Sequence, residues 1–157
     1  MKKNLSILLL VFLLACTSNE LILKVVSAGQ LFDDIQKNNS SDLILINVWS
    51  TWCVPCINEL DAISEVYEDW QDETNMELIA ISTDDSRTKK RIRPLVNGKD
   101  WEYEILLDDN QDLKRALNIS VLPHLLVTKN GKIVYRKTSY TPGSEDELYE
   151  IIQKYTN

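Results

Sequence analysis

Two cysteines, Cys53 and Cys56, stand two residues apart in a chain of 157 residues. One turn of helix brings sulfurs at this spacing close enough to bond, while the first sulfur stays at the exposed helix end. A thiolate there can attack a disulfide of another molecule, and the second cysteine can then resolve the mixed disulfide. The spacing therefore predicts thiol–disulfide exchange, with Cys53 as the nucleophile and Cys56 as the resolving residue. A plain structural disulfide and half of a zinc or copper site are the alternatives.

The segments on either side of the pair are typical of a strand and a helix. Residues 43–49 (LILINVW) form the short, apolar, β-branched run of a buried strand. From Ile57 to Trp70, apolar residues recur every three or four positions, as on one face of a helix. The cysteines then lie at a helix N-terminus, where unpaired N–H groups and the helix dipole favour a thiolate. Pro55 suits the first helical turn.

Further strands and helices are expected to alternate along the rest of the chain. The Asn130-Gly131 dipeptide predicts a β-hairpin between two apolar runs. Strands that alternate with helices imply an α/β fold with a parallel core, and the hairpin adds an antiparallel edge. Strands are expected near residues 21–26, 78–81, 103–107, 125–127 and 133–135, and helices near 27–37, 86–96, 112–117 and from Ser144.

Composition and charge narrow the classes of function. The chain is 44% hydrophobic and 26% charged, as in soluble globular proteins. Its net charge of −7 argues against nucleic-acid binding, and we interpret the basic cluster at residues 87–93 as a solvated helix face. No glycine fingerprint for a flavin or nicotinamide is present, so no cofactor is expected.

The N-terminus has the features of a targeting segment. Lys2 and Lys3 precede an apolar run over residues 5–15 that is too short to span a bilayer. The run ends in the sequence LLAC, which resembles a bacterial lipobox, with cleavage before Cys16 and lipidation of that cysteine. A plain cleaved signal with an incidental cysteine is the alternative. Either interpretation places the protein outside the cytoplasmic membrane, where disulfides persist.

These features predict three parts of the chain. Residues 1–15 are expected to be a lipoprotein signal peptide, residues 16–24 a tether, and residues 25–157 one domain with a full core. Acyl chains on Cys16 would hold the domain stably at a membrane surface, because each buried CH₂ contributes roughly 0.8 kcal/mol.

Residues 47–56 (NVWSTWCVPC) resemble the active-site segment of the thioredoxin superfamily. The likeness is closer to the TlpA/ResA-like branch, the membrane-tethered thiol–disulfide oxidoreductases of the bacterial envelope. Trp49 and Trp52 fall at the two tryptophan positions of that pattern, and Asn47 falls where cytoplasmic thioredoxins have a buried aspartate. The resemblance implies a thioredoxin fold with a helix–strand insertion near residues 86–107. Asp61 departs from the pattern, since many members have a helix-kinking proline near that point.

A second segment carries the same resemblance. Leu122-Pro123 resembles the cis-proline loop that faces the two cysteines in the thioredoxin fold. The likeness implies a cis bond between these residues and backbone pairing of Leu122 with a substrate. Together with Trp52, Val54 and Pro55, the loop would form the substrate-binding surface. A trans proline that opens an edge strand is the alternative.

Two titratable residues lie close to these segments in the sequence. Glu59 follows Cys56 by three residues, at a position where the tethered branch usually has glutamate, and could accept or relay the Cys56 proton. An ordinary surface acid is the alternative. His124 directly follows Pro123, and because side chains alternate along a strand we favour an orientation away from the site over proton exchange with the thiols.

The resemblance implies an enzyme that reduces disulfides of envelope proteins and receives electrons from a membrane donor. Cytochrome c maturation and general reduction of envelope proteins are both consistent with it. A thioredoxin-fold protein that handles copper through Cys53, Cys56 and His124 is the alternative from another class. A peroxiredoxin is disfavoured, because Ser50 and Ile46 stand where its pattern has threonine and proline.

Overall fold

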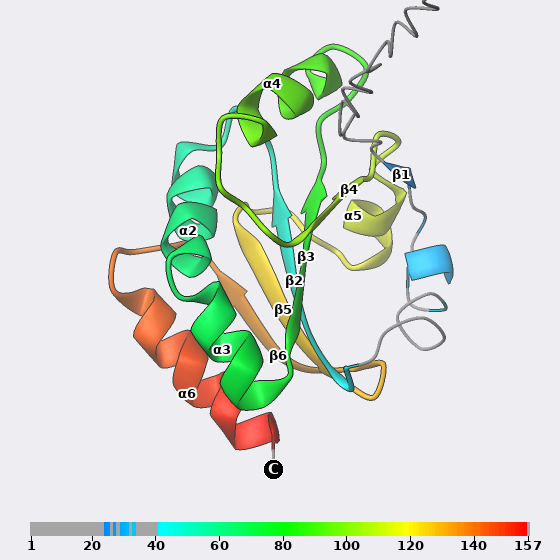
Figure 1. The fold of residues 1–157 in the computed structure, drawn as a ribbon. Helices are drawn as coiled ribbons and strands as arrows, with labels where there is room; N and C mark the ends of the chain where they lie inside the picture. The colour runs from blue at the N-terminus through cyan, green and yellow to red at the C-terminus, as the bar shows by residue number, and fades with distance from the viewer. Residues whose placement is uncertain (1–23, 26, 28, 32, 34–40, 157) are drawn as a thin grey trace, which may run out of the picture.

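The computed structural model describes residues 24–25, 27, 29–31, 33 and 41–156. Its centre is a six-stranded sheet in the order β1-β4-β3-β2-β5-β6 (Figure 1). The first four strands of this order run parallel, and β5 and β6 are antiparallel additions at the side of β2. The expected α/β thioredoxin fold is therefore confirmed. The strands are β1 (Lys24–Val25), β2 (Leu43–Trp49), β3 (Glu77–Ser82), β4 (Glu104–Leu107), β5 (His124–Lys129) and β6 (Lys132–Thr138).

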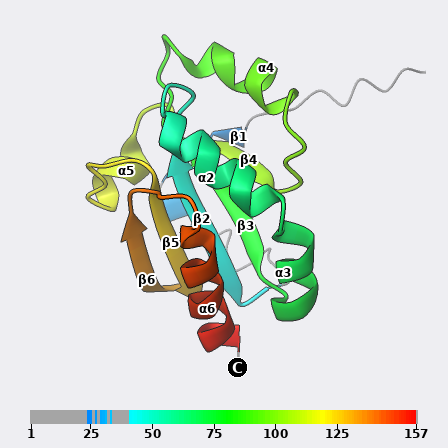
Figure 2. The ribbon, with the colours of Figure 1, turned by 90° about the vertical axis from the view of Figure 1, so that its left-hand side faces the viewer.

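Helices cover both faces of the sheet. Figure 2 shows three helices in front of one face, α2 (Val54–Ser64), α3 (Tyr67–Thr74) and α6 (Ser144–Thr156). The short helix α5 (Asp112–Ala116) lies on the other face. The 3₁₀ turn η1 (Lys89–Arg91) and helix α4 (Ile92–Val96) lie at the end of the sheet where β2 stops, and with β4 they supply the helix and strand expected over residues 86–107.

The central strand β2 is buried along its whole length, because helices cover both of its faces. Alternate side chains of β2 enter two separate apolar clusters. One cluster lies under α2, α3 and α6 and includes Leu43, Leu45, Trp49 and both site cysteines. The other includes Ile44, Ile46, Val48 and Leu113 of α5. Both faces of β2 are thereby packed in the core, and the site begins at the end of this strand.

The apolar spacing from Ile57 to Trp70 predicts one helix, but the structure has two, α2 and α3. Between them Val66 leaves the helical region (φ −121°, ψ 2°). Its N–H donates to the carbonyl of Ile63 at 3.1 Å, which tightens the last turn of α2. The apolar face continues across this break, and its periodicity alone therefore does not locate the break.

Asp61, in α2, contacts the segment between α4 and β4. Its two oxygens accept hydrogen bonds from Lys99 Nζ at 2.6 Å and from Trp101 Nε1 at 3.0 Å. The Trp101 ring packs edge-on against Trp49, with centroids 5.4 Å apart. Asp61 thus ties the segment between α4 and β4 to the helix that begins after Cys53.

Of the strand expected near residues 21–26, the structure describes Lys24 and Val25, which form β1. A helix begins after Ser27, whose carbonyl accepts the Leu31 N–H at 2.9 Å. Most of the helix expected over 27–37, the signal segment 1–15 and the lipidation residue Cys16 lie outside the described residues. Within the residues that are described, no helix has the length and apolarity needed to cross a bilayer.

Candidate active site

Cys53 and Cys56 form a disulfide at the junction between β2 and α2, so the structure shows the oxidised form of the pair. Cys53 is the extended residue that precedes the helix, and its carbonyl accepts the Ile57 N–H at 3.1 Å. Pro55 lies in the first turn, as expected, where its missing N–H leaves no partner unsatisfied. The predicted position of both cysteines at a helix N-terminus is confirmed.

The two sulfur-bearing residues differ in burial. Cys53 is 6% exposed and Cys56 is fully buried. The flanking Trp52 is 57% exposed, and Val54 is also exposed. Because only Cys53 reaches the surface, the burial favours it as the residue that meets a substrate, with Cys56 behind it.

The Leu122–Pro123 peptide bond is cis, as the resemblance implied. Pro123 directly precedes β5, whose first residue, His124, is paired with Val48 near the end of β2. Since β2 and β5 are antiparallel, the end of β2 and the start of β5 lie at the same end of the sheet. The cis-proline loop and the disulfide are therefore neighbours, although long stretches of chain separate them.

Val121 is an exposed apolar residue in the same loop. It adds to the apolar surface that Trp52 and Val54 present at this end of the sheet. No sequence pattern singles it out, because an isolated valine before a Leu-Pro pair looks like a core residue. Its place in the cis-proline loop is the signal that marks it.

Glu59 is 3% exposed, so the alternative of an ordinary surface acid is wrong. The Asn47 Nδ2 group donates to Glu59 Oε2 at 2.7 Å. Burial raises the pKa of Glu59 to about 7, and the Asn47 hydrogen bond and the charge of Lys137 only partly offset this effect. A carboxyl group with this pKa gains and loses a proton near neutral pH, and it lies one helical turn from Cys56.

Lys137 belongs to this environment through strand pairing. Asn47, Leu125 and Lys137 occupy one row across β2, β5 and β6, on the face that α2 covers. The Lys137 ammonium group also donates to the carbonyl of Ser144 at 3.2 Å. Because the row depends on the register of three strands, no local motif marks Lys137 as part of the site.

The Asn47 side chain has one polar atom without a partner. Its Oδ1 is buried and accepts no hydrogen bond within the described structure. A buried acceptor of this kind costs free energy unless a donor reaches it. Asn47 therefore binds Glu59 through its Nδ2 group, while its Oδ1 atom remains a buried acceptor without a donor in the described structure.

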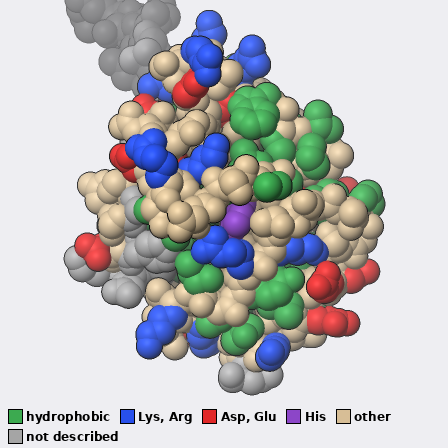
Figure 3. All heavy atoms as spheres, turned by 180° about the vertical axis from the view of Figure 1, so that it is seen from behind, with side chains coloured by type: hydrophobic (Ala, Val, Ile, Leu, Met, Phe, Trp, Pro, Cys, Tyr) green, Lys and Arg blue, Asp and Glu red, His purple; other side chains and the backbone are tan. Residues whose placement is uncertain are grey.

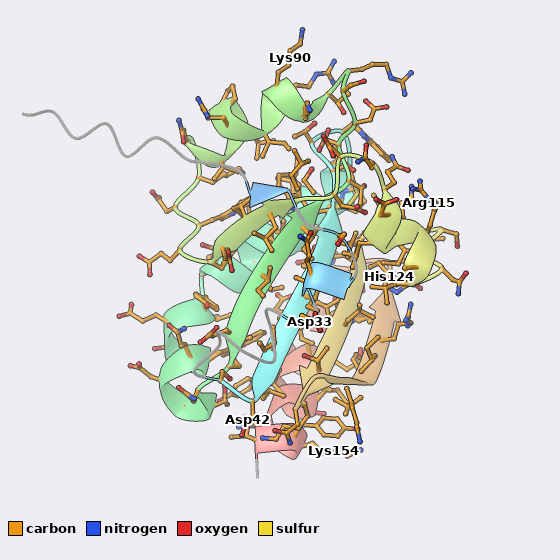
Figure 4. All side chains as sticks on the ribbon, turned by 90° about the vertical axis from the view of Figure 1, so that its right-hand side faces the viewer. Asp33, Asp42, Lys90, Arg115, His124 and Lys154 are labelled. Atoms are coloured by element: carbon orange, nitrogen blue, oxygen red, sulfur yellow. A yellow bond between two sulfur atoms is a disulfide. The ribbon has the colours of Figure 1, made fainter. Side chains whose placement is uncertain are left out.

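His124 points away from the cysteines, as favoured from strand alternation. It is paired with Val48, which belongs to the cluster on the α5 side, and Figure 4 shows it on that face. Its Nε2 lies 2.9 Å from Arg136 Nη1. It is 4% exposed, and Figure 3 shows its small exposed part as a purple patch near the centre of the view. Burial and the Arg136 charge lower the pKa of His124, which keeps the ring neutral.

The residues of the copper alternative are thus not brought together. Cys53 and Cys56 belong to the cluster under α2, while His124 lies on the opposite face with Nε2 held against Arg136. In the part of the chain that the structure describes, no three His, Cys, Asp or Glu side chains form a group that could hold a metal ion.

Comparison with known proteins finds thiol–disulfide oxidoreductases and thioredoxins among the relatives. The thiol–disulfide oxidoreductase ResA of Bacillus thuringiensis is 27% identical over 115 residues, which are 72% of this chain and 63% of that protein. The chain therefore spans less than two thirds of the length of the curated relatives it matches first. The thioredoxin of Listeria monocytogenes is 26% identical over 120 residues, covering 76% of this chain and 89% of that protein.

Solved structures give the same fold. A thioredoxin-like protein from Porphyromonas gingivalis is 46% identical, with a TM-score of 0.67 over 75% of this chain and 78% of that protein. The DsbE protein of Chlorobium tepidum has a TM-score of 0.66 at 15% identity, over 73% and 80% of the two chains, and supports the fold alone. The AhpC/TSA family model matches residues 27–136. The chain belongs to the AhpC/TSA family of thioredoxin-like proteins.

Proposed function

We propose that this protein is a thiol–disulfide oxidoreductase of the bacterial envelope that reduces disulfides of partner proteins. The observation that carries the proposal is the disulfide between Cys53, which is 6% exposed, and the fully buried Cys56, one turn from a carboxyl group with a pKa of about 7. The ResA relatives bear the name of this activity. The apolar surface of Trp52 and Val54 suits a protein substrate better than a small polar one.

The proposed reaction starts from the reduced pair. The Cys53 thiolate attacks one sulfur of the substrate disulfide, and the other substrate sulfur leaves as a thiolate. Cys56 loses its proton to Glu59 and attacks the Cys53 sulfur, which releases the second substrate thiolate. Two electrons pass to the substrate, and the protein is left with the disulfide that the structure shows. A membrane protein that donates two electrons then restores the dithiol.

The environment of Glu59 supports the reducing direction. When Glu59 is charged, its negative charge disfavours a thiolate in the pair. A less stable thiolate destabilises the reduced form relative to the disulfide, which makes the protein a better reductant. Cytochrome c maturation and general reduction of envelope proteins are the two proposed physiological roles. Identification of the partner proteins would distinguish between them.

The activity is tested with insulin as the protein disulfide and dithiothreitol as the electron source. The wild-type protein is expected to accelerate insulin reduction, and Cys53→Ala is expected to abolish the acceleration, because no reachable nucleophile remains. The measurement is the rate of insulin precipitation. A wild-type rate equal to that of dithiothreitol alone would refute the proposed activity.

We also propose that the lipobox-like sequence anchors the protein through Cys16. The mature protein is expected to begin at Cys16, to carry acyl chains and to partition with membranes. Cys16→Ser is expected to lose the acyl mass and the membrane fraction while it retains insulin reduction. Intact mass and cell fractionation measure this. An unacylated wild-type protein in the soluble fraction would contradict the proposal.

A further inference from the structure

We propose that Asp84 is a positioning residue, which holds the turn that carries Trp52 and thereby sets the surface on which a protein substrate docks. This inference rests on the proposed function. Asp84 follows β3 and is fully buried. No sequence motif points to it, and its partner Thr51 lies 33 residues earlier in the chain.

The Asp84 carboxylate receives three hydrogen bonds. The Thr51 N–H donates to Oδ2 at 2.8 Å, and the Thr51 hydroxyl donates to Oδ1 at 2.6 Å. The Ser82 hydroxyl donates to Oδ2 at 2.7 Å. A carboxylate is an acceptor at both oxygens, so it matches three donors in a way that an amide cannot. Two of these bonds fall on one residue of the active-site segment.

Thr51 lies at the centre of a tight turn. The Cys53 N–H donates to the carbonyl of Ser50 at 3.0 Å, which places Thr51 and Trp52 at the two central positions. Asp84 binds Thr51 by backbone and side chain together, so it sets the orientation of the peptide that leads directly to Trp52. The position of an exposed side chain such as Trp52 depends chiefly on its own backbone.

A second contact joins the same two segments. The Ser50 and Thr83 hydroxyl oxygens lie 2.8 Å apart, and the Thr83 N–H donates to the carbonyl of Trp49 at 2.9 Å. The segment that follows β3 therefore clamps the segment that follows β2. Asp84 is the charged member of this clamp and reaches closest to Trp52 along the chain.

Cys53 closes this turn through its N–H, but it also has a support outside the turn. Its carbonyl accepts the Ile57 N–H of α2, whereas Thr51 and Trp52 belong to no helix or strand. Loss of the Asp84 contacts would therefore displace the docking surface more than the nucleophile. The expected signature is weaker binding of a protein disulfide with little change in the intrinsic reactivity of Cys53.

The test compares Asp84→Asn with Asp85→Asn in the full-length chain. Asparagine has the same side-chain shape as aspartate. Its amide nitrogen is a donor, however, and would have to face at least one of the Thr51 and Ser82 donors without forming a hydrogen bond. Asp85 is the matched control, since it is the adjacent carboxylate, lies outside the clamp and pairs with the exposed Arg87. Asp84→Asn is expected to raise KM for insulin about tenfold, the change that corresponds to roughly 1.4 kcal/mol. In Asp84→Asn the rate of Cys53 alkylation by iodoacetamide should change less than about twofold. In Asp85→Asn both KM for insulin and this alkylation rate should change less than about twofold.

Four further variants separate positioning from a general loss of structure. Thr51→Val removes the hydroxyl donor and should raise KM for insulin, and Thr51→Ser should restore it. Trp52→Ala should raise KM as well, and adding Asp84→Asn to it should have little further effect, because both act through one surface. Equal KM values in Asp84→Asn and Asp85→Asn, or additive effects of Asp84→Asn and Trp52→Ala, would overturn the inference. If Asp84→Asn does not fold, the comparison of KM for insulin between Thr51→Val and Thr51→Ser tests the inference instead. A wild-type protein that does not reduce insulin would instead refute the proposed function itself.

Discussion

Replacing Cys56 by alanine is expected to turn the protein into a trap for its partners. Cys53 can still attack a substrate disulfide, but no second thiol remains to resolve the mixed disulfide. In Cys53→Ala the remaining Cys56 is fully buried and meets no substrate. Covalent complexes should therefore accumulate in Cys56→Ala and be nearly absent in Cys53→Ala.

Non-reducing gels and mass spectrometry of the trapped species measure this result in cells. Haem-attachment proteins among the partners would favour cytochrome c maturation, and a varied set of envelope proteins would favour general reduction. The variant with both cysteines replaced is the control for non-covalent capture. Equal trapping by the two single variants would contradict the assigned roles.

Glu59→Gln is expected to change the pH dependence of stability of the oxidised protein. Burial raises the pKa of Glu59 from 4.5 to about 7, so between these values the unfolded chain releases a proton that the folded protein retains. The wild-type free energy of unfolding should therefore fall as pH rises through this window, by about 3 kcal/mol for this group. Glutamine does not titrate and should remove that loss, while its side-chain oxygen can still accept from Asn47.

Urea unfolding of the oxidised protein below pH 4.5 and above pH 7 tests this expectation. The gain of Glu59→Gln over the wild type should appear at the higher pH and vanish at the lower one. Glu65→Gln is the matched control, because it removes an exposed carboxylate just beyond the end of the same helix. A gain that is the same at both pH values would show that Glu59 does not titrate in this window.

The same substitution should alter the reduced protein. Above pH 7 the charged Glu59 disfavours thiolate formation, so Glu59→Gln should lower the apparent pKa of the coupled dithiol. The variant should then be a weaker reductant in equilibrium with glutathione. Thiolate absorbance against pH gives the first quantity. An unchanged titration would remove Glu59 from proton transfer and leave it a structural role.

Local patterns in the sequence were sufficient for the parts of the site that lie on single segments. A strand run, two cysteines and an apolar helix periodicity are contiguous in residues 43–70, so their order alone places Cys53 at a helix N-terminus. The cis bond before Pro123 followed from resemblance rather than from physics, because most X–Pro bonds are trans.

The remaining features depend on contacts between segments that only the fold brings together. The burial of Glu59 requires α2 to pack over Asn47, and helix periodicity alone does not show how deep that packing is. The three donors to Asp84 come from Thr51, which follows β2, and from Ser82, the last residue of β3. These strand ends meet because β2 and β3 are parallel neighbours. The break between α2 and α3 lies at Val66, where the backbone leaves the helical region. The apolar spacing continues through this point and therefore does not reveal the break.

The pairing of β2 with β5 also determines when, during folding, the cis-proline loop comes to face Cys53. Cys53 follows β2, whereas Pro123 precedes β5, so the two are opposed only after most of the chain has been synthesised and this distant pair has closed. Pairings between such distant segments form late and slowly in folding. A nascent or truncated chain would thus present its thiols without the loop that opposes them. The surface proposed for docking protein disulfides is therefore complete only in molecules in which β2 and β5 have paired.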